Sequence, residues 1–200
     1  MTVALALLDI QHGILFSDKI PWERPEIPEE TAAAGAQFLQ IGRNAGVPVL
    51  QVGVQRTLAR GQFDEVRTAA AENASKAPKD IMALADGKDI EFIHPLQDGE
   101  EGVFKIGVGC FIGTRLDIVL RNLGVRDVVI AGAFTHMVVE STVRQGFDLG
   151  YHMIVVPEAS CSPNAALHEN SLKFGISNFA SIVGIDDLAA FLAERSHGGN

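Results

Sequence analysis

Cysteine and basic residues are scarce in this sequence, and both scarcities exclude classes of protein. Two cysteines, Cys110 and Cys161, occur in 200 residues. Their spacing suits neither a metal site nor the disulfide framework of a small secreted protein, so we expect reduced thiols in a cytoplasmic protein. Lysine and arginine total 16 against 25 aspartates and glutamates, a formal net charge of −9. Nucleic acids and anionic membrane surfaces bind clustered positive charge, so we expect neither as a partner.

Long uninterrupted apolar runs are also missing. The apolar start, MTVALALLDIQ, is broken by Asp9 and lacks the basic leader and small-residue cleavage site of a signal peptide. It therefore reads as a first buried strand, and not as a membrane span. With 47% hydrophobic residues, the chain is long enough to bury about 70% of its unfolded surface. We expect one domain over residues 1–200, because no linker, repeat or low-complexity tract divides the sequence.

Short apolar runs alternate with segments of helical period. This alternation is typical of parallel βαβ units. It predicts an α/β fold, a three-layer α/β/α sandwich around a mostly parallel central sheet. From Gln55 to Gly87 neither period is clear. The predicted strands are residues 3–8, 47–54, 127–133, 153–156 and 181–183, with 90–93 and 103–106 as short candidates, and the predicted helices are 29–45, 116–123, 135–147, 165–174 and 186–194.

The stretch VRDVVIAGAFTHMVVESTVRQGFDLG, residues 125–150, organises the chain. It predicts a buried strand that passes through Gly132 into a helix, with Thr135 as the helix cap and Val139, Val143 and Phe147 as the apolar row. In an open α/β sheet, ligands bind above such a strand end, where the helix N-terminus offers unpaired N–H groups. Residues 134–138 should therefore border the site. No serine, cysteine or lysine occupies positions 137–139, where a nucleophile would be expected.

Two charged residues close predicted strands. Asp9 ends the first strand and Lys105 ends the candidate strand 103–106. In a parallel sheet both would reach the same edge and form an ion pair that keeps both charged. A carboxylate that only caps a loop, and a surface lysine, are the alternatives. The glycines of KIGVGCFIGT fit neither a dinucleotide fingerprint nor a P-loop, so they predict a tight loop.

Four blocks together resemble the isochorismatase-like hydrolases, also called cysteine hydrolases, over nearly the whole chain. LLDIQHGI and KIGVGCFIGTRL resemble the blocks that carry the family's catalytic Asp and Lys, which map to Asp9 and Lys105, with Phe111 and Thr114 following the lysine. VVIAGAFTHMVVESTVRQGFDLGY resembles the nucleophile block. HENSLKFGISNFASIVGIDDL resembles the tail, with His168 at a common family position.

The departure from the family lies at its nucleophile. The resemblance places the family's cysteine at Val138, which has no thiol, so an acyl-enzyme at this residue is impossible. It also implies a cis peptide between Ala133 and Phe134, and an oxyanion hole of backbone N–H groups around Phe134 and Val138. Nicotinamidases of the family carry an Asp-x-His metal cluster where this chain reads VGVQRTLARG. We therefore predict no metal, no other cofactor and no nicotinamidase activity.

Isochorismatases proper also lack the cysteine, and they cleave a vinyl ether with water. In that chemistry an acid protonates the enolpyruvyl methylene carbon, a role that would fall to Asp9. Gln55 resembles a substrate-contacting glutamine of these enzymes, and His136 resembles the histidine of their Ala-His pair. Phe111 and Phe134 complete the predicted substrate contacts, and Phe16, Trp22 and Phe111 are candidates for an apolar wall.

The sequence therefore predicts water-mediated hydrolysis of a small, anionic or cyclic molecule, assisted by Asp9 and Lys105. Two alternatives stay open. One is a catalytically silent binding or scaffold protein, and the other is an amidase with a different nucleophile, for which Cys110 and Cys161 are the candidates. Assembly into a homo-oligomer is implied by the resemblance.

Overall fold

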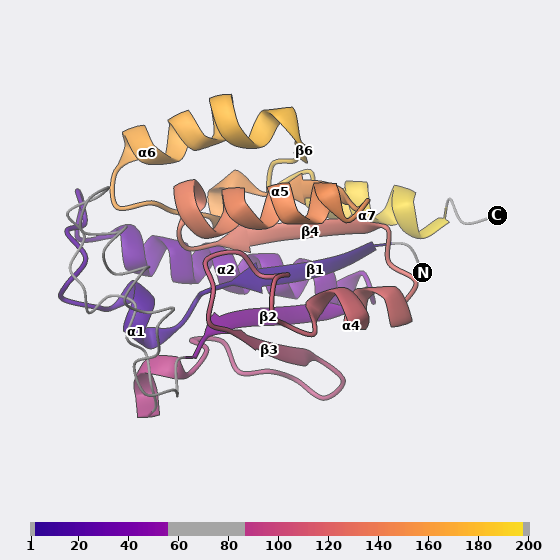
Figure 1. Ribbon diagram of the computed structural model, residues 1–200, viewed down its shortest axis with the longest axis horizontal. Coiled ribbons are helices and arrows are strands. Elements are labelled where there is room, and N and C mark those ends of the chain that lie inside the picture. Colours follow the sequence, from indigo (N-terminus) through magenta and orange to yellow (C-terminus); the bar gives the residue numbers. More distant parts are fainter. Residues whose placement is uncertain (1–2, 56–86, 198–200) are drawn as a thin grey trace.

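A six-stranded parallel sheet forms the centre of the computed structural model (Figure 1), which describes residues 3–55 and 87–197. The strand order is β3-β2-β1-β4-β5-β6, and each neighbouring pair is parallel. The predicted segment without clear periodicity falls mostly in residues 56–86, outside the described residues. The strands are β1 (Val3–Leu8), β2 (Val49–Val54), β3 (Glu101–Lys105), β4 (Asp127–Gly132), β5 (His152–Val155) and β6 (Ala180–Ile182).

Helices cover both faces of this sheet because the strands are apolar on both sides. The helices are α1 (His12–Leu15), α2 (Ile27–Asn44), α4 (Leu116–Asn122), α5 (Glu140–Asp148), α6 (Ala165–Asn170) and α7 (Leu188–His197). In β1, alternate side chains enter two different clusters: Leu5 and Leu7 pack with residues of α2 and α7, whereas Ala6 and Leu8 pack with residues of α4 and α5. The predicted three-layer α/β/α sandwich is thus confirmed.

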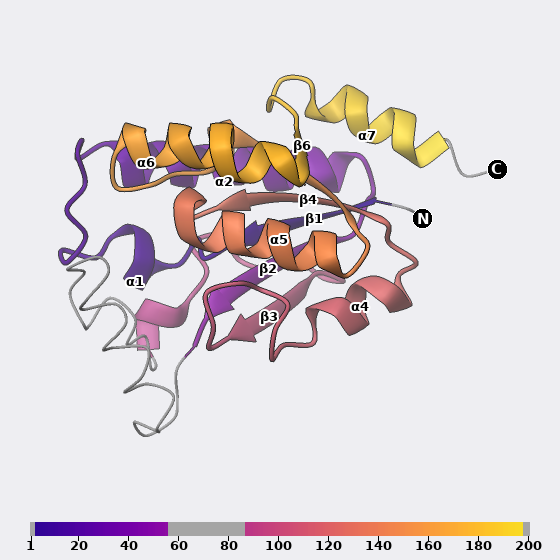
Figure 2. The same cartoon turned by 45° about the horizontal axis from the view of Figure 1, so that its top comes forward.

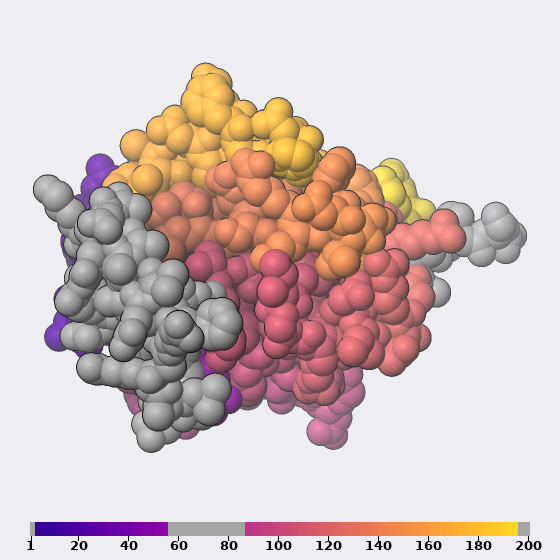
Figure 3. Space-filling model, viewed as in Figure 1, coloured from indigo at the N-terminus to yellow at the C-terminus, as the bar shows by residue number. Residues whose placement is uncertain are grey.

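The surface view shows the segment that contains α6 and the residues after it lying above α5 on one side of the molecule (Figure 3). Figure 2 shows the layers from a tilted angle, with α5 and α4 in front of the sheet. None of the helices in residues 3–55 and 87–197 is long and apolar enough to cross a membrane.

The strand predicted at residues 90–93 is wrong. Residues Gly87–Ile90 form a 3-10 turn, and Phe92 makes an isolated antiparallel bridge with Gln11. The buried Gln11 side chain donates its amide N–H to the carbonyls of Ile90 (2.7 Å) and Val54 (3.1 Å). A side chain therefore binds this segment, where the apolar pattern indicated a strand ladder. The strand expected at residues 103–106 begins earlier, at Glu101.

Other elements deviate at their ends. Helix α2 begins at Ile27, before the predicted Glu29, because a proline such as Pro28 is tolerated in the first helical turn. Phe147, expected on the buried face of its helix, is 50% exposed and packs edge-on against Phe179. The row of buried apolar side chains on this helix therefore ends before Phe147, earlier than the spacing of apolar residues in the sequence predicted.

The chain reverses its direction across the sheet between β1 and β4. From β1 it builds β2 and β3 on one side, and it then returns to build β4, β5 and β6 on the other. At such a switch point the loops that follow adjacent strands separate and leave a crevice for ligands. The residues that follow β1 and β4, beginning with Asp9 and Ala133, therefore border the expected site.

Candidate active site

Asp9 and Lys105 meet at the carboxyl edge of the sheet. Asp9 directly follows β1 and adopts a left-handed backbone conformation (φ 54°), while its N–H donates to the Val52 carbonyl at 2.7 Å. Lys105 ends β3 and reaches past the tip of β2, so that its Nζ lies 2.8 Å from Asp9 Oδ2. Both side chains are at most 3% exposed. The predicted ion pair is confirmed.

The loop after β3 completes the surroundings of the ammonium. Besides Asp9, Lys105 Nζ donates to the carbonyls of Gly107 (3.1 Å) and Val108 (2.9 Å). An ammonium has three N–H donors, so every one of them has an acceptor. The lysine is therefore held in place from several directions, which lets it remain charged while buried.

The Asp9 carboxyl group has an unusual electrostatic environment. Its Oδ1 is buried and has no hydrogen-bond partner among the described residues. Burial raises the pKa of Asp9 from 3.8 to about 6, although the charge and the hydrogen bond of Lys105 act in the opposite direction. With such a pKa, about a tenth of the molecules carry a protonated Asp9 at pH 7. The group can therefore both give and accept a proton near neutral pH.

The end of β4 lies beside Asp9. Gly132 has a φ of 142°, and any side chain there would collide with the Leu8 carbonyl, so glycine permits the close approach of β4 to β1. The Ala133–Phe134 peptide is cis, as the resemblance implied. A π-helical turn, Thr135–Val139, follows before α5. The Phe134 carbonyl accepts N–H donors from Met137 (3.1 Å), Val138 (2.8 Å) and Val139 (3.1 Å).

Thr135 does not cap this helix, contrary to the prediction. Its N-cap residue is Phe134, with no side-chain hydrogen bond. The Thr135 hydroxyl donates instead to the Cys161 carbonyl (3.0 Å) and lies 2.8 Å from His168 Nδ1. The donor of the hydrogen bond between Thr135 and His168 depends on which ring nitrogen of His168 carries the proton. Burial lowers the pKa of His168, which favours the neutral ring. His168 thus connects α6 to the turn that carries Val138.

Val138 occupies a packed apolar environment. Its side chain is 4% exposed and belongs to a cluster that includes Cys110, Phe111 and Ile176. Its N–H, one of the donors that the resemblance implies for an oxyanion hole, donates to Phe134 within the turn. The position expected for the nucleophile therefore presents an isopropyl group among apolar neighbours.

The other predicted contact residues lie in different surroundings. Gln55 follows β2, is half-buried and donates its N–H to the Lys105 carbonyl (3.0 Å), which places it next to the ion pair. The Phe111 ring is buried and stacks on Tyr151 at 5.6 Å. Phe134 is buried between rings: Trp22 lies 5.7 Å away and His136 6.1 Å away, between ring centroids.

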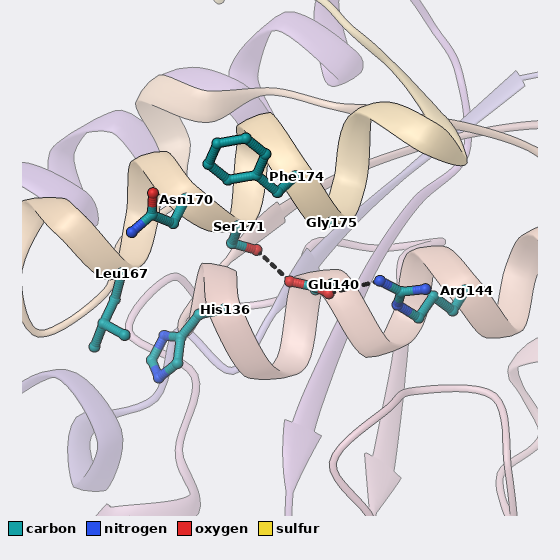
Figure 4. A pocket seen from close by; sticks show the side chains of 8 residues that line it. All are labelled: His136, Glu140, Arg144, Leu167, Asn170, Ser171, Phe174 and Gly175. Atoms are coloured by element: carbon teal, nitrogen blue, oxygen red, sulfur yellow. Dashed lines mark hydrogen bonds and ion pairs between the residues drawn. The ribbon is translucent and has the colours of Figure 1, made fainter.

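His136 belongs to the π-helical turn Thr135–Val139 and also lines a pocket. Its Nδ1 is 2.9 Å from Ser162 Oγ, and burial lowers its pKa. This pocket of about 310 Å³ lies between the start of α5 on one side and α6 and the π-helical turn Ser171–Gly175 on the other (Figure 4). Of the described residues that line it, His136 is the one that the sequence predicted. The full lining is His136, Glu140, Arg144, Leu167, Asn170, Ser171, Phe174 and Gly175.

Glu140 is fixed at the centre of this pocket. Ser171 Oγ donates to its Oε2 at 2.7 Å, and Arg144 donates to its Oε1 at 2.9 Å, as Figure 4 shows. Gly175 packs against the Glu140 carboxylate so closely that a side chain there would overlap with it. Since Asp9 and Lys105 are not among the lining residues, the pocket is distinct from the ion pair.

Two residues of α5 that sequence reasoning did not assign to the site position the loop after Lys105. Thr142 Oγ donates to the Val138 carbonyl (2.7 Å) and accepts the Cys110 N–H (3.2 Å). Gln145 Oε1 accepts the N–H of Phe111 (3.0 Å). The close approach of Gln145 requires a glycine at position 109, where a side chain would collide with it. The glycine at position 109 predicted a tight loop, but nothing in the sequence identified Gln145 as the side chain that packs against it.

Neither cysteine has the surroundings of a nucleophile. Cys110 and Cys161 are both free and buried, and burial raises the pKa of each thiol to about 12. In the described part of the chain, no group of three or more His, Cys, Asp or Glu side chains is arranged to hold a metal ion.

A family model described as Isochorismatase domain matches residues 3–187 of the chain. The chain belongs to the isochorismatase-like hydrolase family. The resemblance carried by the four sequence blocks is thereby confirmed, and the buried Asp9–Lys105 pair lies inside the matched region.

Individual relatives of this isochorismatase-like protein agree with the assignment. It is 40% identical over 178 residues to the isochorismatase family protein YwoC of Bacillus subtilis, covering 86% of this chain and 84% of that protein. It is 35% identical to the ureidoacrylate amidohydrolase RutB of Klebsiella pneumoniae, but over 95 residues, 46% of this chain and 40% of that protein. An isochorismatase family protein from Burkholderia thailandensis has the same fold, with a TM-score of 0.78 and 24% identity over 96% of each chain.

Proposed function

We propose that this isochorismatase-like protein hydrolyses a small vinyl ether with water, and that Asp9 supplies the proton. The observation that carries the proposal is the state of the Asp9 carboxyl group. One carboxyl oxygen is paired with Lys105, and the other has no hydrogen-bond partner among the described residues. The pKa of Asp9 is raised to about 6. A buried acid with a pKa near the working pH is suited to proton transfer.

The chemistry follows from this arrangement. Protonated Asp9 gives its proton from Oδ1 to the methylene carbon of an enolpyruvyl ether, which leaves an oxocarbenium ion on the substrate. Water adds to that cation and loses a proton, which restores the acid, and the resulting hemiketal separates into pyruvate and an alcohol. Lys105 lies 2.8 Å from Oδ2 and stabilises the carboxylate that exists between the two proton transfers.

The absence of a competent thiol supports a route through water. Val138 carries no sulfur atom, and each cysteine has a pKa of about 12. At pH 7 a thiol with that pKa is ionised in about one molecule in 10⁵. If this chain were an amidase, as the similar ureidoacrylate amidohydrolase RutB is by its name, it would need a nucleophile other than these two cysteines.

A second candidate function is supported by the environment of Val138. Its side chain is 4% exposed and packs in an apolar cluster. A substrate carbon that must approach this position would meet tightly packed side chains. This favours a protein that retains a ligand site and has lost turnover, and the experiment must separate it from the water mechanism.

The test is a hydrolysis panel of isochorismate and other vinyl ethers, amides and esters. Under the water mechanism, vinyl ethers release pyruvate, measured by a coupled lactate dehydrogenase assay. In D₂O the pyruvate carries one deuterium in its methyl group, because the transferred proton comes from an exchangeable acid. We expect Asp9→Asn to lower kcat by about 10²–10⁴-fold. The matched control Asp98→Asn, in an exposed turn, should leave the rate unchanged.

Two other outcomes decide for the alternatives. If thiol alkylation with iodoacetamide abolishes the activity, an amidase-type cysteine mechanism replaces the water mechanism. If no compound in the panel is hydrolysed, and Asp9→Asn binds the compounds of the panel with the same affinity as the wild type, the protein is a binding protein without turnover.

A further inference from the structure

The pocket between α5 and α6 has the size of a small-molecule site. The turn Thr135–Val139 and α5 line it on one side, and α6 and the turn Ser171–Gly175 line it on the other (Figure 4). Its volume of about 310 Å³ lies at the lower end of the range for ligand pockets. Neither Asp9 nor Lys105 is among the described residues that line it. The pocket is therefore a place for a ligand that the proposed hydrolysis does not use.

A carboxylate with unused acceptor capacity lies in this pocket. The Glu140 side chain is 23% exposed, and each of its oxygens accepts one hydrogen bond, Oε1 from Arg144 and Oε2 from Ser171. A carboxylate has about four acceptor positions, so about two remain for a ligand. The buried Ser171 hydroxyl holds Oε2 at 2.7 Å, which keeps the carboxylate in place if Arg144 moves.

Arg144 is the partner of Glu140 that a ligand can replace. Its side chain is 48% exposed, and it pairs with Glu140 one turn earlier on the same helix. Exposed pairs of this kind contribute little to stability. The guanidinium carbon also lies 4.7 Å from the centroid of the Phe179 ring, which gives the side chain a second contact after it leaves Glu140. A ligand cation can therefore take the position of the guanidinium at Oε1.

Asn170 and His136 add two further acceptors to the pocket. The Asn170 side-chain amide is exposed and has no hydrogen bond to a described residue. The His136 ring is half-buried, and its Nδ1 lies 2.9 Å from Ser162 Oγ. The tautomer that donates from Nδ1 leaves Nε2 as an acceptor. Together with Glu140, these side chains match the three N–H donors of a primary ammonium group.

Leu167 and Phe174 give the same pocket an apolar wall. Their side chains are 38% and 63% exposed, so a ligand can cover both. Lys173 Nζ lies 5.0 Å from the centroid of the Phe174 ring, which shows that this ring already attracts an ammonium group. The wall therefore suits the apolar part of a molecule whose other end is cationic.

We propose that the pocket between α5 and α6 binds a small primary amine with an aromatic tail. Its ammonium group donates to Glu140 in place of Arg144, and its tail packs on Leu167 and Phe174. The net charge of −9 favours the approach of a cation to the molecule. The binding is non-covalent, and it depends on neither Asp9 nor turnover.

The experiment uses 2-phenylethylamine, which is charged at neutral pH, as the probe. It is titrated into the full-length protein while ¹H–¹⁵N spectra follow the Asn170 side-chain amide and the Gly175 N–H, and calorimetry gives the affinity. We expect both signals to shift to saturation. Two compounds of similar shape are the ligand controls: 2-phenylethanol has no charge, and trimethyl(2-phenylethyl)ammonium has the charge but no N–H donor. Each should bind at least about tenfold more weakly.

Substitutions separate the ammonium contact from the effect of net charge. Glu140→Gln should lower the affinity at least about tenfold, because it removes the charge and keeps an oxygen for Ser171. Glu169→Gln removes the same charge from an exposed position of α6 outside the pocket lining. It is the matched control and should bind as the wild type does. Arg144→Met should bind the amine more tightly, because Glu140 loses the group that competes with the ligand.

The inference is overturned if 2-phenylethylamine does not bind at millimolar concentration, if 2-phenylethanol binds as tightly, or if Glu140→Gln binds as Glu169→Gln does. Should Glu140→Gln fail to fold, Arg144→Met decides, since unchanged or weaker binding contradicts the competition between guanidinium and ligand. Asp9→Asn separates this site from the proposed hydrolysis. We expect it to lose pyruvate release and to bind the amine with wild-type affinity, and a lower affinity would show that the amine binds at the ion pair instead.

Discussion

Lys105 Nζ lies 2.8 Å from Asp9 Oδ2 although the two residues belong to strands that are not neighbours. Strand β2 lies between them, so the contact depends on the length of the lysine side chain and on the left-handed turn at Asp9. Because both groups are buried, each one compensates for the desolvation of the other.

Removing the cation should therefore destabilise the protein. In Lys105→Met we expect the free energy of unfolding to fall by about 3 kcal/mol, because the Asp9 carboxyl group stays buried without its partner. The pKa of Asp9 should rise further, since Lys105 acts to lower it. Chemical denaturation measures the first effect and a carboxyl ¹³C titration the second. The double variant Asp9→Asn/Lys105→Met should recover part of the loss. Arg24→Met, which breaks an exposed ion pair with Glu30, should cause no measurable change.

Stability should depend on pH through Asp9 in a defined direction. Its pKa is raised from 3.8 to about 6 on folding, so between these pH values the folded state binds more protons than the unfolded state. The stability that Asp9 contributes is fully present below pH 3.8 and falls as the pH rises to about 6, by roughly 3 kcal/mol. Urea denaturation of the wild type and of Asp9→Asn measures it as the difference between the two proteins. A difference that stays constant across this pH range would contradict the raised pKa.

A thiol placed at position 138 should be unreactive. Val138→Cys introduces a side chain at a position that is 4% exposed, in the apolar cluster that also buries Cys110, and such burial raises the pKa of a thiol. We expect iodoacetamide to modify the introduced thiol no faster than Cys110 and Cys161, whose thiols have pKa values of about 12. Mass spectrometry of the digested protein locates the modification, with the wild type as the control. Faster alkylation at position 138 would show that reagents reach this position, and would contradict the packing of Val138 as the basis of the binding protein without turnover.

Gln145 should control the order of the loop after β3. In Gln145→Met the N–H of Phe111 loses its side-chain acceptor, and we expect the free energy of unfolding to fall by about 1–2 kcal/mol. Hydrogen exchange should accelerate at Phe111 and Ile112. Gln40→Met, whose glutamine contacts Asn44 on an exposed helix face, is the matched control. Equal exchange rates in the two variants would show that Gln145 does not hold the loop.

The alternation of apolar strands and helices was sufficient to predict the layered fold and the edge where the charges meet. Asp9 and Lys105 could be predicted because each ends a strand, and parallel strands end at the same edge. Residues 90–93 were misread because a side chain, Gln11, binds their backbone, and no local pattern reports such a contact. The role of Thr135 was missed for the same reason: its partners, Cys161 and His168, are distant in the sequence. The indole N–H of Trp22 is buried without a hydrogen-bond partner among the described residues. This depends on three-dimensional packing, so it could not be predicted from the sequence.

The order of the strands has a consequence for how the molecule assembles. Asp9 and Lys105 are separated by 96 positions, and the closure of so long a loop is slow relative to local helix formation. While β3 is still undocked, Asp9 has no counter-ion and can enter the core only in its protonated form. The nascent N-terminal half should therefore compact more readily in mild acid than at neutral pH. Once β3 has docked, Lys105 supplies the counter-ion and Asp9 can be buried as a carboxylate.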